Sequence, residues 1–194
     1  SSTHRGMDYA VPRGTAVVVK KYATVLFTGY KKSWGNVAIL AYDSFDSRRG
    51  VFGIYAHLGK KENATRAKGK GSQPVNGQDS QGDGLIVSSG DILSPGHVIG
   101  LVGNTGKMYA KNPKGDGTHL HYQQVEFSVE RLNELKADGV IADEKARDIM
   151  DAYQDFLEAN DSNRAQRSYE FVNHDWVQSC FTVNPLTGQY GACP

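Results

Sequence analysis

Short runs of β-branched and aromatic residues, separated by clusters of Gly, Asn, Asp and Ser, fill the first two-thirds of the chain. Runs of this length, bounded by turn-forming residues, are typical of β-strands. They cover residues 15–19, 24–28, 37–42, 51–58, 98–102 and 120–127. The pattern predicts a mainly antiparallel β-sheet.

Two segments depart from this strand pattern. Residues 59–90 are mostly polar and lack a clear period, which predicts a long loop or insertion outside the core. Apolar residues then recur at steps of three and four over residues 146–157. That spacing predicts an amphipathic helix, with Asp143 as its N-cap, whose apolar face packs against the sheet or a partner helix. We also expect a shorter helix over 129–136 and a strand over 171–183.

Length and charge exclude several classes of protein. The 194 residues suffice for one domain, or one domain with an insertion, to bury a core without a structural metal. With 22 basic and 21 acidic residues the net charge is +1, so the chain lacks the basic surplus of a nucleic-acid binder. No apolar run approaches the ~18 residues of a membrane span. The N-terminus has neither an initiator Met nor a signal-peptide pattern, as in a mature or trimmed fragment.

The two cysteines, Cys180 and Cys193, lie close together near the C-terminus. They could close a small disulfide loop in an oxidising compartment, or they could be free thiols. Their spacing is too long for a Cys-x-x-Cys zinc knuckle, and the chain has no second pair. A role as zinc ligands is therefore disfavoured.

Four short segments, far apart in the sequence, carry the candidate chemistry. Residues 4–8, 55–58, 103–106 and 118–121 together supply one carboxylate and four imidazoles. Carboxylate and neutral imidazole suit zinc, and a catalytic zinc ion uses three protein ligands and keeps one open position. The set therefore predicts a catalytic zinc site with spare acid–base groups.

The parity of the strands indicates which side chains share a face. Residues two apart on a strand point the same way, so His119 and His121 should project together with Gln123. Glu126 should face the other way unless a β-bulge intervenes, which argues against it as a general base. The same parity puts Tyr55 on the face of His57, and His57 becomes the candidate to complete the cluster.

His4 and Asp8 belong to a His-x-Gly-x-Asp segment at the start of the chain. Gly6, Pro12 and Gly14 favour a loop that enters a strand over a helix. Flexible backbone there could bring both side chains round one ion. Either motif alone is common without a metal, and their occurrence in one chain is what favours a site.

Two further histidines, His97 and His174, lie outside these motifs. His97 falls in a Pro-Gly turn and His174 adjoins Asp175. We expect both to be surface or packing residues.

The order of the motifs resembles that of the lysostaphin/LytM-type zinc endopeptidases, which cut peptidoglycan cross-links. The resemblance covers about the first two-thirds of the chain, and Val183-Asn184-Pro185-Leu186 is similar to the closing segment of that family. It is carried by His4-Arg5-Gly6-Met7-Asp8, Gly14-Thr15-Ala16-Val17, Tyr55-Ala56-His57-Leu58, the run from Pro95 to Gly106, and His119-Leu120-His121.

The resemblance implies a fold and a set of site residues. The fold is mainly β, an antiparallel sheet with a groove across it, here with an added helical segment. The resemblance implies zinc (Zn²⁺) held by His4, Asp8 and His121. It leaves His57 and His119 unligated, one as general base for the metal-activated water and both stabilising the oxyanion, without assigning which does which.

Three features depart from the family pattern. Only residues 1–3 precede His4, where the family has an ordered segment. Residues 107–118 form a longer loop rich in Lys and Gly, which should overhang the site. A helical block after Phe127 replaces a short hairpin and would act as a lid, a groove wall or a docking surface.

These observations predict a zinc-dependent endopeptidase that hydrolyses peptide cross-links of bacterial peptidoglycan. Its partners would be stem peptides or cross-bridges, and it would act as a monomer in the periplasm or the extracellular cell wall. We expect a catalytic β core over 1–127, a helical insertion over 128–170, and a C-terminal strand and tail over 171–194. The alternatives are a non-catalytic module that binds the wall or regulates a hydrolase, and a wall-peptide carboxypeptidase.

Overall fold

A seven-stranded antiparallel sheet forms the centre of the computed structural model, which describes residues 4–43, 45–112 and 115–193. Six strands follow the order β1-β11-β5-β4-β3-β8, and β12 also pairs with β11. The strands of this sheet are β1 (Met7–Tyr9), β3 (Ala23–Lys31), β4 (Gly35–Tyr42), β5 (Arg49–Leu58), β8 (Ile92–Leu93), β11 (Leu120–Ser128) and β12 (Thr182–Val183). The prediction of an antiparallel sheet is confirmed.

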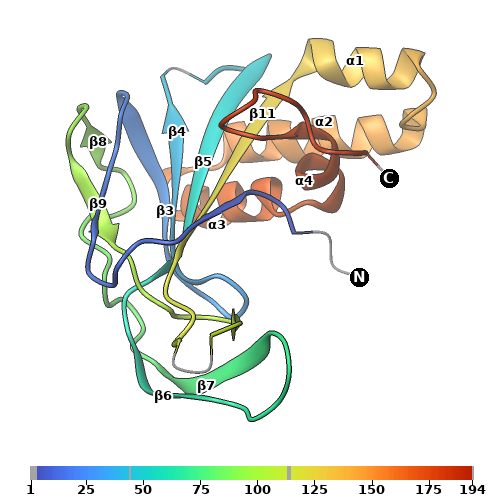
Figure 1. Cartoon of the computed structure of the whole chain (residues 1–194). Helices are drawn as coiled ribbons and strands as arrows, with labels where there is room; N and C mark the ends of the chain where they lie inside the picture. Colours follow the sequence, from blue (N-terminus) through green and yellow to red (C-terminus); the bar gives the residue numbers. More distant parts are fainter. Residues whose placement is uncertain (1–3, 44, 113–114, 194) are drawn as a thin grey trace.

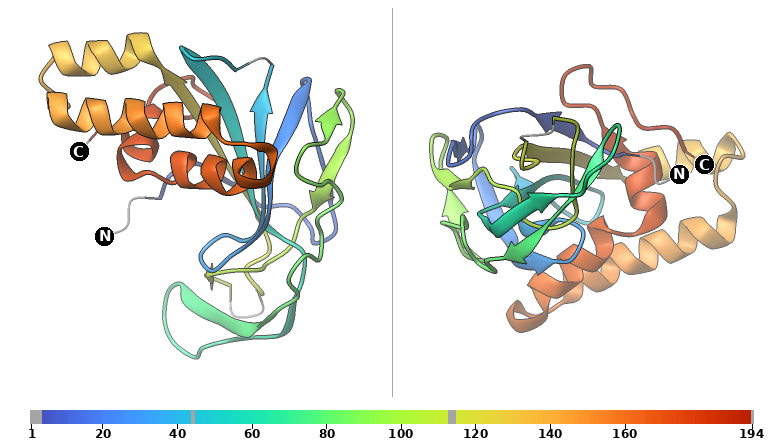
Figure 2. Two further views of the ribbon diagram at one scale, coloured as in Figure 1. Left: turned by 180° about the vertical axis from the view of Figure 1, so that it is seen from behind. Right: turned by 60° about the horizontal axis from the view of Figure 1, so that its bottom comes forward.

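Both faces of this sheet are covered (Figure 1). One face packs against a two-stranded sheet of β2 (Ala16–Val18) and β9 (Val98–Leu101), and the other packs against the helices. The view from behind in Figure 2 shows the helices and the β2–β9 pair on opposite sides. All eight residues of β4 are buried, because a strand covered on both faces has no solvent side.

Four helices follow the last long strand of the sheet. They are α1 (Val129–Ala137), α2 (Asp143–Glu158), α3 (Asp161–Val172) and α4 (Asp175–Phe181). The Ser128 side chain caps α1 by accepting a 3.0 Å hydrogen bond from the Arg131 backbone N–H. The helices expected over 129–136 and 146–157 are confirmed, but Ala142 is the N-cap of α2 and Asp143 is its first residue. Asp143 still lies where the helix dipole favours an acid.

The strand expected over 171–183 is wrong for most of its length. α3 runs to Val172 and α4 occupies Asp175–Phe181, which leaves only Thr182–Val183 as β12. Val177, Cys180 and Phe181 are buried at helical steps of three and four. So short an apolar run does not distinguish a strand from a buried helix by its period.

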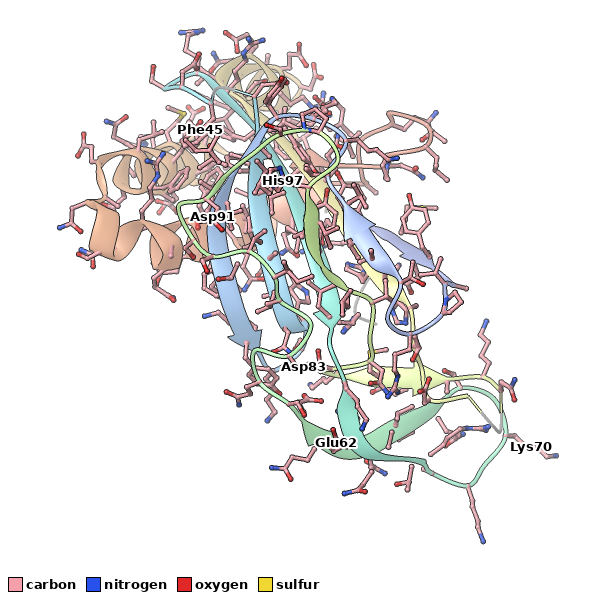
Figure 3. The ribbon with its side chains drawn as sticks, turned by 90° about the vertical axis from the view of Figure 1, so that its left-hand side faces the viewer. Phe45, Glu62, Lys70, Asp83, Asp91 and His97 are labelled. Atoms are coloured by element: carbon pink, nitrogen blue, oxygen red, sulfur yellow. A yellow bond between two sulfur atoms is a disulfide. The ribbon has the colours of Figure 1, made fainter. Side chains whose placement is uncertain are left out.

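The polar stretch over 59–90 contains a hairpin. β6 (Lys61–Arg66) and β7 (Gln73–Asp79) pair with each other, and β10 (Met108–Ala110) pairs with β7. Figure 3 shows this hairpin projecting beyond the end of the main sheet, with Lys70 far from the sheet. Buried Val75, Met108 and Ala110 form its own small apolar cluster. The segment therefore lies outside the main core as expected, but its strands are paired and it is no simple loop.

Cys180 and Cys193 form a disulfide. It ties the tail after β12 to the buried helix α4. Of the two possibilities that the sequence left open, the structure has the bonded one. Among the helices of the described residues, none is long and apolar enough to cross a membrane.

Candidate metal centre

Strand pairing brings the first motif to the last. β1 lies antiparallel to β11 with Asp8 directly opposite His121, although the two are 113 positions apart. Asp8 Oδ1 lies 2.9 Å from His121 Nδ1 and 3.1 Å from His4 Nε2. The three side chains place their ligand atoms within 4.8 Å of one another. The structure thus gathers the three predicted ligands into one cluster.

The donor set fits a zinc ion. Two imidazoles and one carboxylate are ligands that zinc prefers, and the donors of a tetrahedral zinc lie roughly 3.3 Å apart. The side chains of His4 and Asp8 are 57% and 44% exposed, whereas that of His121 is 8% exposed. One side of the cluster therefore faces solvent. An ion held there by His4, Asp8 and His121 would keep a position accessible to water or a substrate.

Gly6 makes this convergence sterically possible. Its φ is +105°, a conformation that side-chain-bearing residues rarely adopt. A Cβ at this position would lie 2.6 Å from the Tyr122 carbonyl oxygen and 3.0 Å from His121 Cε1. Because only glycine avoids both penalties, it lets the chain turn tightly against β11 between the two ligands.

His57 and His119 stand beside the cluster. Their ring centroids are 5.0 Å apart, and those of His57 and His121 are 5.9 Å apart. His57 Nδ1 lies 2.8 Å from the Thr105 carbonyl oxygen, and His119 Nδ1 lies 2.8 Å from that of Gly117. A carbonyl oxygen only accepts hydrogen bonds, so each Nδ1 carries the proton. In the neutral ring, Nε2 then carries no proton, and that of His119 lies 3.4 Å from Asp8 Oδ1.

His57 reaches this position through a local irregularity of β5. Tyr55 is opposite Tyr122 in register, and both line the core on the β2–β9 side. Simple alternation would place His57 there too, but His57 has φ +61°, and the β4–β5 register shifts at Asn36 to Ala38. The expectation that Tyr55 and His57 share a face is therefore wrong. Because His57 has a left-handed backbone conformation, its side chain lies on the opposite face of the strand from the one that regular alternation predicts.

The rest of the parity prediction holds. On β11, residues 121, 123, 125 and 127 are buried, and the residues between them are half-buried. Tyr122 packs on the β2–β9 side, and Glu126 accepts a 2.7 Å hydrogen bond from Gln124 on that same face. Glu126 therefore points away from the metal cluster, as expected.

Burial and the neighbouring ionisable groups set the protonation of the site. Burial, with His119 nearby, lowers the pKa of His57 to about 3. Burial opposes ionisation of Asp8, but hydrogen bonds with His119 and His121 outweigh it and hold the pKa of Asp8 well below its usual range. Burial lowers the pKa of His119, but the hydrogen bonds with Asp8 and the Gly117 carbonyl oxygen, together with the charge of Asp8, outweigh burial and raise that pKa. His57 is therefore neutral and Asp8 ionised near neutral pH.

The Gly-Asn-Thr-Gly segment at 103–106 holds these groups in place. The Thr105 carbonyl oxygen accepts a hydrogen bond from His57 Nδ1, and the Thr105 hydroxyl donates one to the Leu58 carbonyl oxygen. The Asn104 side chain accepts from the Lys61 backbone N–H at 2.8 Å and donates to the Asp116 carbonyl oxygen at 3.0 Å. The segment thus positions His57 and the start of β6.

Asp79 was not anticipated from the sequence. Its carboxylate pairs with Lys61 Nζ at 2.6 Å and accepts from the Gly106 backbone N–H at 2.9 Å. This buried pair therefore fastens the β6–β7 hairpin to the segment beneath His57. Nothing in the sequence spacing of Lys61 and Asp79 indicates that their side chains meet.

The loop over 107–118 is tied to the site at its end. Asp116 accepts hydrogen bonds from the Thr118 backbone and side chain, and Arg13 forms an ion pair with it. The next residue, Gly117, orients His119. Part of the loop pairs as β10, and residues 113–114 lie outside the described residues.

His97 and His174 lie outside the cluster, as expected. His97 is exposed and contacts Ser94 in its turn. The His174 ring accepts from the Trp176 backbone N–H at 3.3 Å and caps α4. Both are local structural residues, and only the four motif histidines gather at the site.

Sequence comparison identifies relatives of part of this chain. No protein-family model matches it. A stretch of 120 residues, 62% of the chain, is 30% identical to the DD-carboxypeptidase/endopeptidase Mpg of Neisseria meningitidis serogroup B. The protein of the same name from Neisseria gonorrhoeae matches with the same identity and coverage. The chain spans 19% of the length of these curated relatives.

Solved structures that are similar to part of this chain include LytU, at 25% identity and a TM-score of 0.44, with 65% of this chain and 63% of that chain covered. The lysostaphin catalytic domain from Staphylococcus simulans is 22% identical with a TM-score of 0.42, and the match covers 64% of this chain and 68% of that chain. A zinc-containing peptidase from Vibrio cholerae also matches at 22% identity and a TM-score of 0.42, covering 63% of this chain and 27% of that one.

Proposed function

We propose that this protein is a zinc-dependent endopeptidase that hydrolyses peptide cross-links of bacterial peptidoglycan. The observation that carries the proposal is the convergence of five groups from separate motifs. His4, Asp8 and His121 form a cluster that suits zinc, and His57 and His119 stand beside it, each with its Nδ1 held by a backbone carbonyl oxygen. Both the motif order and the Mpg relatives support this class of substrate.

The residues divide the chemistry according to their surroundings. Bound zinc would supply Lewis-acid chemistry, lowering the pKa of water and polarising a peptide carbonyl. The His119 side chain is 20% exposed whereas His57 is buried, so we assign His119 the proton transfer between water and the leaving amine. Buried His57 stays neutral and accepts a hydrogen bond that orients the attacking water. Ionised Asp8 would offset one of the two positive charges of the ion.

The proposal is tested by mass spectrometry of fragments released from purified sacculi, of both diaminopimelate and glycine-bridged types. Release that stops when a zinc chelator is added would establish the activity and identify the bond. His121→Ala should lose zinc and activity together, whereas His119→Ala should keep zinc and slow turnover by ~100-fold or more. Failure of zinc-loaded protein to release fragments from either wall would contradict the proposal. A non-catalytic module would then take its place.

A wall-peptide carboxypeptidase is the second candidate, favoured by the name of the Mpg relatives, which combines both activities. The same groups would act on the terminal bond of a stem peptide. Loss of a single terminal residue, seen as a fixed mass difference without cleavage of cross-links, would separate this activity from an endopeptidase.

We further propose that the chain works in the periplasm or the extracellular wall as a monomer, with a catalytic core over 1–127. In this proposal the helices over 128–170 form an insertion, and residues 171–194 complete the core. The pairing of β12 with β11 supports the last point. Size-exclusion chromatography with light scattering tests the monomer, and a dimer mass would contradict it.

A further inference from the structure

A cavity adjoins the metal cluster, between the first described residues of the chain and its C-terminal tail. β5 occupies one edge of β11, so β1 and β12 share the other edge end to end. Figures 1 and 2 show both chain ends on this side of the molecule. The cavity has a volume of about 510 Å³, and His4 and Arg5 line it opposite residues 182–193. Because His4 belongs to both, the cavity adjoins the metal cluster.

Arg5 carries the positive charge of this cavity. Its Nη1 donates to Gln178 Oε1 at 3.1 Å and its Nη2 donates to Ser179 Oγ at 2.7 Å. Gln178 in turn donates to Asn173 Oδ1 at 3.1 Å, which fixes its amide so that Oε1 faces Arg5. The guanidinium is therefore held in one orientation by buried residues of α4.

Both of these acceptors are neutral, which distinguishes Arg5 from several other arginines of the chain. Arg13, Arg48, Arg131 and Arg167 each form an ion pair with a carboxylate. Among the described residues no carboxylate pairs with Arg5, and the lining of the cavity contains no acidic side chain. A half-buried guanidinium whose charge is not balanced locally is suited to bind an anion.

The rest of the cavity wall is polar and tied in place. Thr182 accepts a 3.1 Å hydrogen bond from Gln123, which lies two residues beyond His121 on the same face of β11. The tail folds back so that Gly191 donates to the Thr182 carbonyl oxygen at 2.6 Å, and the disulfide at Cys193 anchors its end. Side-chain amides and hydroxyls that line the wall, such as Asn184 and Gln189, match the hydrogen-bonding groups of a peptide.

We propose that Arg5 binds a carboxylate of the wall peptide and that the cavity beneath the tail is the subsite for this part of the substrate. The proposal rests on the proposed function, because it takes the substrate of the metal cluster to be a wall peptide. Nε–H and the second N–H of each Nη remain to donate to a carboxylate, and the cavity that Arg5 lines adjoins the metal cluster at His4. Arg5 is then a specificity-determining residue, and it selects peptides that carry a free carboxylate near the scissile bond.

Peptide binding tests the inference without requiring turnover. The probes are acetyl-D-alanyl-D-alanine and its C-terminal amide, added to zinc-loaded protein and followed by calorimetry. We expect the free acid to bind about 10-fold or more tightly than the amide. Arg5→Gln should reduce this preference to within about twofold, whereas Arg147→Gln, which removes the same charge from an exposed position on α2, should preserve it. An unchanged preference in Arg5→Gln would overturn the inference.

A second measurement observes Arg5 in wild-type protein, so that a misfolded variant is not mistaken for a loss of carboxylate recognition. The Nε–H resonance of Arg5, identified by its disappearance in Arg5→Lys, should shift when wild-type protein binds the free acid. A shift of equal size with the amide would overturn the inference, because the carboxylate would then not be the group recognised.

The two proposals fail independently. Release of wall fragments with no preference for the free acid would sink only the role of Arg5. A clear preference that Arg5→Gln abolishes, in a protein that releases no fragments, would sink only the proposed hydrolysis.

Discussion

Two residues with left-handed backbone, Gly6 and His57, bring the side chains of the candidate site together. Gly6 has φ +105° and lets the first motif turn against β11, and His57 has φ +61° and turns its ring away from the face of Tyr55. A non-glycine residue in this region is strained by about 1–2 kcal/mol. His57 is also buried and neutral. Its backbone strain therefore lowers the stability of the fold at the position where the site needs an unprotonated imidazole.

Gly6→Ala should lower zinc affinity by about 10-fold or more, because the new Cβ would clash with the Tyr122 carbonyl oxygen and displace His4 or Asp8. Competition with a chromophoric chelator measures the affinity. Gly14→Ala is the matched control, since Gly14 also has positive φ, +79°, but has nothing within 4 Å of its Cβ position. Equal losses in the two variants would show that backbone strain alone, and not the contact with β11, is responsible.

His57 should make the protein less stable in acid. Its folded-state pKa of about 3 lies below the ordinary value of 6.5, so between these pH values the unfolded chain binds a proton that the folded protein does not. Stability conferred by the neutral ring is present above pH 6.5 and is lost as the pH falls. His57→Gln should therefore gain stability relative to wild type by up to ~1.4 kcal/mol per pH unit on acidification from pH 6 to pH 4.

Urea unfolding of chelator-treated protein at several pH values measures this difference. The exposed His97→Gln variant is the control and should follow the pH dependence of wild type. Parallel curves for His57→Gln and wild type would contradict the low pKa of His57.

At the scale of elements, strand pairing and the hairpin below the sheet build the site. The alternation along β11 was readable from the sequence and correctly predicted the faces of His121, Gln123 and Glu126. The β6–β7 hairpin could not be predicted from the sequence, because its polar residues show no alternation and its pairing depends on the buried Lys61–Asp79 contact. Asp79 also accepts a hydrogen bond from the Gly106 backbone N–H, and the neighbouring Thr105 carbonyl oxygen orients His57.

Lys61→Met should destabilise the protein by about 3–5 kcal/mol, because it leaves the buried carboxylate of Asp79 without its partner. The side chains of Lys61 and Asp79 are only 6% and 10% exposed. In the neighbouring Lys60–Glu62 pair the exposures are 50% and 47%, so Lys60→Met should cost less than about 1 kcal/mol. Urea denaturation compares the two variants, and similar losses would mean that burial does not decide the strength of these pairs.

At the scale of the whole molecule, the two ends of the chain meet along one edge of β11. β1 and β12 lie there end to end, and the tail after β12 is fastened to α4 by the disulfide. The cavity that contains Arg5 exists only because of this meeting. No local pattern near Arg5 could have indicated it, since its partners Gln178 and Ser179 lie more than 170 positions later in the chain.

Loss of the disulfide should destabilise the protein by about 3 kcal/mol, as expected for a closed loop of this length. The cysteines are 13 positions apart. Cys193→Ser is the appropriate change, because Cys193 is only partly buried whereas Cys180 is fully buried in the core. Thermal melting with and without a reductant provides the measurement. A reductant should lower the melting temperature of wild type and leave that of Cys193→Ser unchanged, and a wild type insensitive to reductant would contradict the prediction.

The sequence by itself determined the antiparallel sheet and the helices α1 and α2, because the hydrophobic period is a local property, and its motifs named the residues that gather in the candidate cluster. It also determined that His121 and Gln123 share a face, since alternation on a regular strand follows from backbone geometry. The tertiary structure alone decided the side on which His57 lies, the helical state of residues 175–181 and the cavity at Arg5. Each of these depends on packing or pairing between segments distant in the chain, and such contacts override local preference.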